Sequence, residues 1–302
     1  MASANWSAWK PLPLTLSPTV LAETLDGGQS FRWSRLADGE WLGLWGECMA
    51  RIAQTDDGAL RWCAPVSLAE RVERELKIYL GPDSSLAERI DSLPWRSDGH
   101  LAQCLTAFPG LRILRQPFGD TLLCFLCSAT KQIVQIKQMV ALLAERHGRE
   151  IAPGFNRLPS WAELADVSEL TLRECLLGFR AHYIHQTACF LEENPGWLAA
   201  TETLPYPEAK ERLCTLPGVG EKVADCALLF GAGRLEAFPV DVWILKTMER
   251  HYGLAGWKPA QVAQFGCAHF GPLAGLAQQY LFAHERRASR ILRPPQESKP
   301  SG

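Results

Sequence analysis

Two hydrophobic patterns follow one another along the chain. Up to about residue 64, short apolar runs rich in aromatic residues alternate with turn sequences, which is typical of antiparallel β-hairpins. The turns fall at residues 37–39 and 56–58, and the apolar runs are QSFRW, EWLGLW, MARIAQ and ALRWC. We therefore predict a β region at the front of the chain.

Helical spacing of apolar residues begins with SLAERVERELKIYL, residues 67–80. Ser67 is placed to cap this helix, and the Gly81-Pro82 pair is placed to end it. From about residue 100 onward, almost every segment is expected to be helical. Asp120 is placed to cap the next long helical stretch, which Gly148 closes.

Further helices are predicted over residues 160–167, 168–178, 180–194, 207–216, from 221 onward, 241–253 and 271–288. The fold class that follows is α+β, with an N-terminal antiparallel β/α domain over residues 1–105. An all-helical domain is expected over residues 106–290. Residues 291–302, which contain Pro, Ser and Arg, are predicted to be disordered.

Composition narrows the class of protein. No apolar run approaches the 18 or so residues that span a bilayer, and the N-terminus lacks a basic segment followed by an apolar one. The ten cysteines lie mostly in apolar segments, as free buried cysteines do in a reducing compartment. We interpret Cys124-x-x-Cys127 as core rather than as a redox or zinc pair. The net charge of −2 neither favours nor excludes a nucleic-acid partner.

The segment LPGVG, residues 216–220, joins two predicted helices through an unusually glycine-rich loop. Gly218 and Gly220 allow positive φ angles and let backbone N–H groups converge with no side chain in the way. Such amides at a helix N-terminus bind phosphate. A plain turn between two helices explains LPGVG equally well.

Lys222 follows this loop, near the start of the next predicted helix. The positive end of the helix dipole disfavours a cation there, although a solvated lysine is the simplest interpretation. Asp241, in the segment PVDVW, has the position of a helix N-cap.

The segment LPGVGEKVADC, followed by PVDVW, resembles the helix-hairpin-helix superfamily of DNA glycosylases. The segments GGQSFRW, GLRILRQPFGDTLLCFLCSATKQI and LLGFRAHYI make the chain most similar to the 8-oxoguanine DNA glycosylases within it. The matching stretches run from about residue 20 to residue 287. The resemblance implies a TBP-like antiparallel front domain and a helix-hairpin-helix at about residues 208–231. No cluster of closely spaced cysteines follows the hairpin, so an iron–sulfur cluster is not expected.

The resemblance also implies the chemistry, which is removal of 8-oxoguanine by base flipping followed by Schiff-base lyase activity. Lys222 matches the nucleophile, which must attack as a neutral amine, a form that the helix N-terminus and a dry pocket both favour. Asp241 matches the catalytic carboxylate, which stabilises positive charge on the sugar.

Four further positions match the family's lesion-binding residues. The Gly28 carbonyl would accept the N7 proton that 8-oxoguanine has and guanine lacks. Gln278 would bind the pairing edge of the base, and Phe282 and Cys226 would lie on its two faces.

Contacts with the DNA backbone are implied in the same way. The glycines of the hairpin, Gly218 and Gly220, would place a phosphate. Trp243 stands where the family has a histidine. The carbonyls of Cys214, Leu216 and Val219 match the positions that bind a structural monovalent cation, or Ca²⁺ or Mg²⁺. No cofactor is expected for catalysis.

The chain departs from the family on the opposite strand. Thr130 replaces the asparagine that fills the gap left by the flipped base, and Phe179 replaces the wedge tyrosine. Of the two arginines that hold the orphaned cytosine, Arg180 is kept and Gln135 replaces the other. We expect a reduced preference for cytosine opposite the lesion, since two arginine forks hold a base more rigidly than one.

Two alternatives stay open. One is a glycosylase/lyase for another damaged base, either an oxidised pyrimidine or an alkylated purine. The other is a non-catalytic helix-hairpin-helix DNA-binding protein. The expected partner is double-stranded DNA containing oxidised guanine, and no membrane association is expected. The protein is expected to act as a monomer, in the cytoplasm of a bacterium or in the nucleus of a eukaryote.

Overall fold

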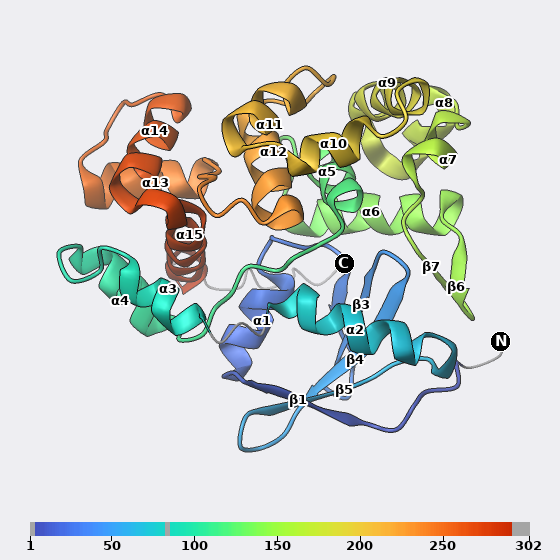
Figure 1. The fold of residues 1–302 in the computed structure, drawn as a ribbon, viewed down its shortest axis with the longest axis horizontal. Coiled ribbons are helices and arrows are strands. Elements are labelled where there is room, and N and C mark those ends of the chain that lie inside the picture. The colour runs from blue at the N-terminus through green and yellow to red at the C-terminus, as the bar shows by residue number, and fades with distance from the viewer. Residues whose placement is uncertain (1–3, 82–84, 292–302) are drawn as a thin grey trace, which may run out of the picture.

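An antiparallel sheet forms one layer of the molecule, and helices form the remainder (Figure 1). The computed structural model describes residues 4–81 and 85–291. The sheet has five strands in the order β1-β5-β4-β3-β2. Their bounds are β1 Lys10–Thr15, β2 Trp33–Arg35, β3 Trp41–Trp45, β4 Cys48–Gln54 and β5 Ala59–Cys63. The predicted α+β class and the antiparallel front of the chain are confirmed.

Alternation of side chains gives the sheet its buried face. Along β3 the residues alternate between buried and half-buried positions, because successive side chains of a strand point to opposite faces. The rings of Trp33 and Trp45 stack with their centroids 5.9 Å apart, and the ring centroid of Tyr79 lies 4.6 Å from that of Trp45. The Trp33 indole donates a hydrogen bond of 2.9 Å to the Tyr79 hydroxyl. Tyr79 belongs to a helix, and its contacts with Trp33 and Trp45 pack that helix against the sheet.

The prediction of a strand over QSFRW is wrong for most of its length. The strand β2 begins only at Trp33, and the residues before it follow a helix, α1 (Pro18–Asp26), which was not predicted. Pro18 is its first residue, and the Ser17 side chain caps it by accepting the N–H of Val20 at 3.2 Å.

The helices and the remaining strands occupy most of the chain after the sheet. Their bounds are α2 Ala69–Leu80, α3 Leu86–Ser92, α4 Gly99–Ala107, α5 Phe118–Leu126, α6 Ile133–His147, β6 Glu150–Ala152, β7 Phe155–Asn156, α7 Trp161–Ala165, α8 Glu169–Leu172, α9 Arg180–Glu193, α10 Trp197–Thr203, α11 Tyr206–Leu213, α12 Glu221–Ala227, α13 Val242–Tyr252, α14 Pro259–Phe270 and α15 Ala274–Ile291. The helical prediction is confirmed for most of this part of the chain, although α3, α10, α14 and the β6–β7 pair were not predicted.

Two predicted caps are wrong. Ser67 lies in a short 3-10 segment, and Leu68 takes the N-cap position of α2 without a side-chain hydrogen bond. Helix α5 begins before Asp120, whose carboxylate instead accepts the N–H of Gly46, 3.1 Å away across the molecule. The ends of α2 and α6 fall at Gly81 and Gly148, as predicted.

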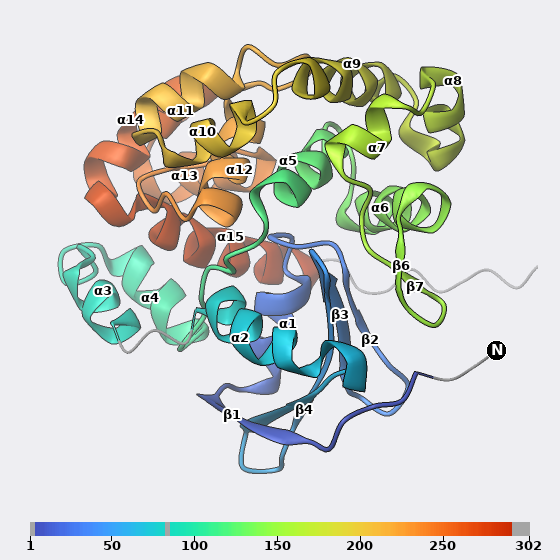
Figure 2. The same ribbon diagram turned by 45° about the vertical axis from the view of Figure 1, so that its right-hand side comes forward.

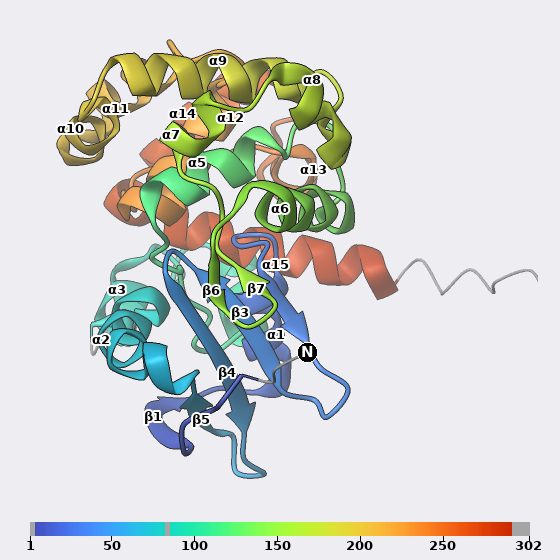
Figure 3. The ribbon, with the colours of Figure 1, turned by 90° about the vertical axis from the view of Figure 1, so that its right-hand side faces the viewer.

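The buried side chains form two clusters. One contains the faces of the sheet, α2 and α4 together with α13, α14 and α15. The other contains the helices from α5 to α12 and one residue of the front segment, Phe31. Helix α15 runs between the sheet and the helical layer (Figures 2 and 3). The chain therefore returns at its end to the core with which it began. The domain boundary near residue 105 stays a prediction, and the proposed disordered tail, apart from Ile291, lies outside the described residues.

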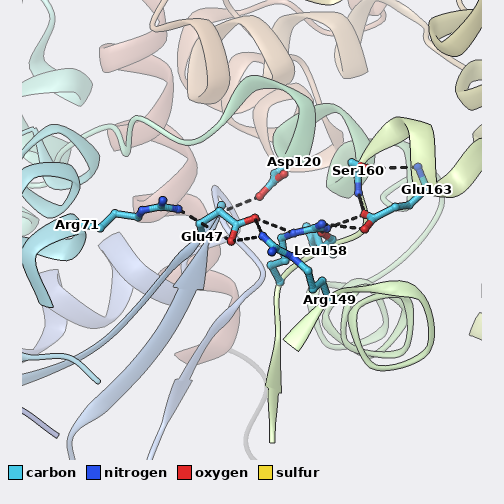
Figure 4. A network of polar contacts seen from close by, with 9 residues as sticks. Glu47, Arg71, Asp120, Arg149, Leu158, Ser160 and Glu163 are labelled. Atoms are coloured by element: carbon cyan, nitrogen blue, oxygen red, sulfur yellow. Dashed lines mark hydrogen bonds and ion pairs between the residues drawn. The ribbon is translucent and has the colours of Figure 1, made fainter. Parts of the chain in front are cut away.

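A network of charged groups joins the turn between β3 and β4 to the β6–β7 hairpin and α7 (Figure 4). Glu47 accepts hydrogen bonds of 2.8 Å from Arg149 and lies 2.8 Å from Arg157 in an ion pair. Arg157 also pairs with Glu163 at 2.7 Å, which lowers the pKa of Glu163 to about 2. The network thus connects elements from both buried clusters. No helix in the described part of the chain combines the length and apolar character needed to cross a membrane.

Candidate active site

Lys222 is the second residue of α12, as its position after the glycine-rich loop predicted. The extended backbone of Gly220 begins the helix, and the half-buried Lys222 side chain reaches across to the end of α5. Its Nζ atom donates a hydrogen bond of 3.1 Å to the Ser128 hydroxyl and lies 5.0 Å above the ring of Phe125. The amine is therefore held between α12 and the end of α5.

Asp241 is the N-cap of α13. Its Oδ1 atom accepts the backbone N–H groups of Trp243 at 3.0 Å and Ile244 at 2.9 Å, so the predicted cap is confirmed. Burial raises the pKa of this carboxyl, while the Ile244 N–H and the charge of Lys222 act in the opposite direction. The carboxylate and the amine are thus close enough to interact electrostatically.

Cys226 lies one helical turn after Lys222 and is buried. Burial raises the pKa of its thiol to about 12; the positive charge of Lys222 opposes this shift, and the carboxylate of Asp241 adds to it. At neutral pH the side chain is a protonated, apolar group. Lys222, Asp241 and Cys226 therefore lie close together, with Cys226 buried and the other two residues half-buried.

Helix α15 brings Gln278 to the same place. The side chain is buried, and its Nε2 atom donates a hydrogen bond of 3.1 Å to the carbonyl of Pro239, two residues before Asp241. The Oε1 atom is buried without a hydrogen-bond partner among the described residues. An unpaired buried acceptor costs free energy, and ligand binding is one way in which such an atom is satisfied.

Gly28 and Phe282 face each other. Gly28 has a φ angle of 106°, and a Cβ atom added to it would lie 3.6 Å from the Phe282 ring and 2.9 Å from Ile133. Only glycine allows this backbone conformation together with such a close approach. The structure thus brings together the C-terminal end of α1, the N-terminal end of α6 and the middle of α15. These three segments are far apart in the sequence.

The QSFRW segment supports this arrangement. The Gln29 side chain donates to the carbonyls of Thr24 and Arg112 and accepts the N–H of Leu114, at 3.1, 3.0 and 2.8 Å. Phe31 makes an edge contact of 5.4 Å with Phe125, the ring beneath Lys222. Sequence reasoning missed these supporting roles, although each residue lies in a motif that carried the resemblance.

The hairpin between α11 and α12 is fixed by packing and by a buried acid. Gly218 has a φ angle of 74°, and a Cβ atom there would lie 2.5 Å from the Tyr183 ring. Asp225 accepts hydrogen bonds from the Tyr206 hydroxyl at 2.7 Å and from Lys210 at 3.0 Å, which holds α11 against α12. Gly220 has no heavy atom near its Cβ position, so its backbone is accessible.

The carbonyls expected to hold a cation lie around this hairpin. Within the described residues, no backbone N–H donates to the carbonyls of Cys214 or Val219, whereas the carbonyl of Leu216 accepts the Val219 N–H at 3.1 Å. Carbonyl oxygens with free lone pairs are suitable ligands for a hard cation. The residues present fit the expected site.

The residues expected to contact the opposite strand form a second group. The buried Arg180 guanidinium donates to the carbonyl of Ala129 and, at 3.1 Å, to the Thr130 hydroxyl. Thr130 has a φ angle of 56°, which is unusual for a β-branched residue. The exposed Gln135 accepts the N–H of Gln132 at 3.2 Å, and the Phe179 ring is 50% exposed.

Trp243, at the start of α13, is half-buried, and Lys246 lies 4.8 Å above its ring. The indole is held beside a positive charge on the same helix. This is compatible with the phosphate contact expected of it.

Comparison with known proteins identifies the family of this chain. The family model described as "8-oxoguanine DNA glycosylase, N-terminal domain" matches residues 11–122. The chain is 34% identical to "N-glycosylase/DNA lyase OGG1" of Arabidopsis thaliana over 304 residues, which cover 94% of this chain and 82% of the relative. This chain belongs to the 8-oxoguanine DNA glycosylase family. Its resemblance to that family, inferred from the hairpin and the QSFRW segment, is confirmed.

Other relatives and solved structures support this assignment. The "N-glycosylase/DNA lyase" of Saccharomyces cerevisiae is 28% identical, with 82% of this chain and 72% of that protein covered. The Clostridium acetobutylicum 8-oxoguanine glycosylase/lyase, solved with double-stranded DNA containing cytosine opposite the lesion, superposes with a TM-score of 0.83 at 27% identity. That match covers 94% of this chain and 99% of the other. The fold of this glycosylase is therefore the fold of its family.

Proposed function

We propose that this glycosylase removes 8-oxoguanine from duplex DNA and cleaves the resulting abasic site, with Lys222 as nucleophile and Asp241 as catalytic carboxylate. The observation that carries the assignment is the convergence of Lys222 and Asp241, each at the start of a helix, with Cys226 one turn after Lys222 on α12. A nucleophilic amine, a carboxylate and an apolar surface for a base are the groups that the reaction requires.

The geometry supports a stepwise reaction. The neutral amine of Lys222 attacks C1′ of the sugar as the N-glycosidic bond breaks, and the electron pair of that bond leaves with the base. Asp241 stabilises the positive charge that develops on the sugar and exchanges protons with the amine. The C1′–O4′ bond of the sugar then breaks, O4′ takes up the proton that the amine has lost, and Lys222 is left as a Schiff base with C1′. The Schiff base allows loss of a proton from C2′ and departure of the 3′ phosphate.

Lesion recognition is proposed for the residues opposite this pair. The Gly28 carbonyl would accept the N7 proton of 8-oxoguanine and repel the lone pair of guanine. The Gln278 Oε1 atom, which is buried without a partner among the described residues, would accept a proton from the pairing edge of the base. Phe282, beside Gly28, would stack on one face of the base and Cys226 on the other.

Phosphate contacts are proposed for the hairpin and for Trp243. The backbone at Gly218 and Gly220 would receive a phosphate, with the Trp243 indole donating to another. The carbonyls around the hairpin would hold a structural cation that supplies positive charge beside the phosphate, and no catalytic step depends on it. We also propose that the protein acts as a monomer in a bacterial cytoplasm.

Covalent trapping tests the proposal. Incubation with an 8-oxoguanine duplex and borohydride should reduce the Schiff base and leave the protein attached to DNA. Lys222→Gln should abolish this adduct, whereas the control Lys246→Gln, on the neighbouring helix α13, should retain it. An adduct that persists in Lys222→Gln would contradict the assignment of the nucleophile.

The same experiment separates the two alternatives. A duplex series carrying oxidised pyrimidines or alkylated purines should give much slower excision than 8-oxoguanine does. A non-catalytic DNA-binding protein would give no adduct with any lesion, and Lys222→Gln would leave all its measurable properties unchanged.

A further inference from the structure

Three metal-ligating side chains meet on the side of α15 that does not carry the proposed base-binding residues. His100 and Cys104 lie one turn apart on α4, and His284 lies on α15. Their nearest ligand atoms all lie within 4.8 Å of one another. Helix α4 runs beside α15 in Figures 1 and 2, and the two helices share one buried cluster. The sequence pattern gave no indication of this group, because His284 follows Cys104 by 180 residues.

The geometry is close to that of a tetrahedral metal site. The Cys104 Sγ atom lies 3.6 Å from the His100 Nε2 atom. With metal–sulfur and metal–nitrogen bonds of about 2.3 and 2.1 Å, tetrahedral ligands are separated by roughly 3.3–3.8 Å. The i, i+4 spacing places two ligands on one helix face, and His284 on α15 supplies the third, with the ligand atoms of all three within 4.8 Å of one another. Thiolate and imidazole ligands together favour zinc among the common divalent ions.

The three side chains differ in their exposure to solvent. Cys104 is fully buried. Binding of a divalent ion would displace the proton of its thiol and form a metal–thiolate bond. His100 and His284 are only half-buried, so an ion and a water ligand can reach the group from solvent.

The surroundings provide a second layer of polar groups. The His251 ring stacks on His100 with centroids 3.6 Å apart and planes 7° from parallel, which fixes the orientation of His100. Asp98, at the start of α4, is held by the Tyr252 hydroxyl and by His269, each at 2.9 Å. In metal sites generally, neighbouring groups hold the ligand side chains in the orientation that the metal requires.

We propose that His100, Cys104 and His284 form a structural zinc site, with water as the fourth ligand, that joins α4 to α15. Helix α15 also carries Gln278 and Phe282, and it is bonded to α13 through Glu285 and Arg250 at 3.1 Å. The ion would stabilise the folded state and hold the helix that supports the base pocket. It takes no part in glycosidic or lyase chemistry.

Cobalt binding tests the site directly. The full chain, stripped of metal with a chelator, should bind one equivalent of Co²⁺ and show a thiolate-to-cobalt charge-transfer band. Binding of Co²⁺ or Zn²⁺ to the metal-free protein should release about one proton from the thiol and raise the unfolding temperature, and Zn²⁺ added to the cobalt form should remove the band by displacing Co²⁺. Cys104→Ser should abolish the band. His284→Gln should weaken Zn²⁺ binding by more than about tenfold, the loss that even outer-layer partners cause.

The chain contains a matched control. His185 and Cys189 on α9 have the same i, i+4 spacing, with Sγ 3.7 Å from the His185 Nε2 atom, but they are not part of a three-ligand group in the described residues. Cys189→Ser should therefore leave the band and the Zn²⁺ affinity unchanged. The half-buried His284 offers a second variant if Cys104→Ser does not fold. A band that survives in Cys104→Ser, or Zn²⁺ affinity that His284→Gln does not alter, would overturn the proposal.

Discussion

Asp241 is stabilised as a carboxylate by three of its neighbours although its burial favours the neutral acid. The two N–H groups at the start of α13 and the Lys222 cation favour ionisation, and removal from water disfavours it more strongly, so the pKa is raised. A group whose pKa is higher in the folded than in the unfolded protein lowers the free energy of unfolding as pH rises through the folded pKa. The residue proposed for catalysis is thus one that costs stability.

Asp241→Asn should separate these roles. Asparagine caps a helix about as well as aspartate does, and it carries no buried charge. The variant should therefore no longer excise the base. Its free energy of unfolding at neutral pH should be higher than that of the wild type. The difference should shrink as pH falls and the wild-type carboxyl becomes protonated. Urea denaturation across pH measures both effects.

Asp241→Ala is the matched comparison, because it removes the cap together with the charge. Its free energy of unfolding should be about 1 kcal/mol below that of Asp241→Asn at every pH. If Asp241→Asn were less stable than the wild type throughout, the raised pKa of Asp241 would be wrong.

At the scale of elements, the loop between α5 and α6 and the first turn of α6 carry two of the departures expected from the resemblance, Thr130 and Gln135. Arg180, the one arginine retained of the family's pair, is buried and bonded to Ala129 and Thr130 within this loop. Gln135, in place of the second arginine, is engaged with the N-cap of α6. The Arg180 guanidinium is therefore engaged by contacts within the protein, and the exposed Gln135 offers a neutral amide where the resemblance leads us to expect a second arginine.

Gln135→Arg should raise the preference for cytosine opposite the lesion. A bidentate arginine contact to a base contributes about 1–3 kcal/mol of discrimination, roughly a 5- to 150-fold ratio of rates. Single-turnover rates with each of the four opposite bases would show a shallow profile for the wild type and a steeper one for the variant. Gln138→Arg, exposed one turn later on α6, controls for the added charge. A steep cytosine preference in the wild type would contradict the expectation.

For the molecule as a whole, Glu47 is the clearest link between the sheet and the helical layer outside the apolar clusters. Its carboxylate contacts Arg149 and Arg157, with Arg71 of α2 at 3.9 Å, so arginines from both sides of the molecule share one acid (Figure 4). Several cations around one partly exposed carboxylate contribute more than an isolated surface pair does.

Glu47→Gln should lower the free energy of unfolding by about 1 kcal/mol, because three arginines lose their shared partner. The loss should be largest at low ionic strength and become small near 1 M salt, where exposed charges are screened. Urea denaturation at the two salt concentrations measures it. Glu249→Gln, at an exposed position of α13, is the control and should show little change at either concentration.

Much of the fold could be predicted because it depends on neighbours in the sequence. Helical periodicity located most helices between α5 and α15, and turn sequences located the turns between β2 and β3 and between β4 and β5. The prediction failed where a distant partner was decisive. Gln29 binds backbone groups more than 80 residues away, so its segment does not pair as a strand, and Asp120 binds Gly46 instead of capping α5.

The sequence by itself determined the family, the hairpin and the positions of Lys222 and Asp241, since each depends on a short segment whose backbone conformation is local. Only the tertiary structure decided that Gly28 faces Phe282, that α15 returns to the core of the sheet, and that His100, Cys104 and His284 meet. These contacts join segments separated by 180 or more residues. Packing of apolar surfaces from the whole chain sets such distances, and no local pattern records them.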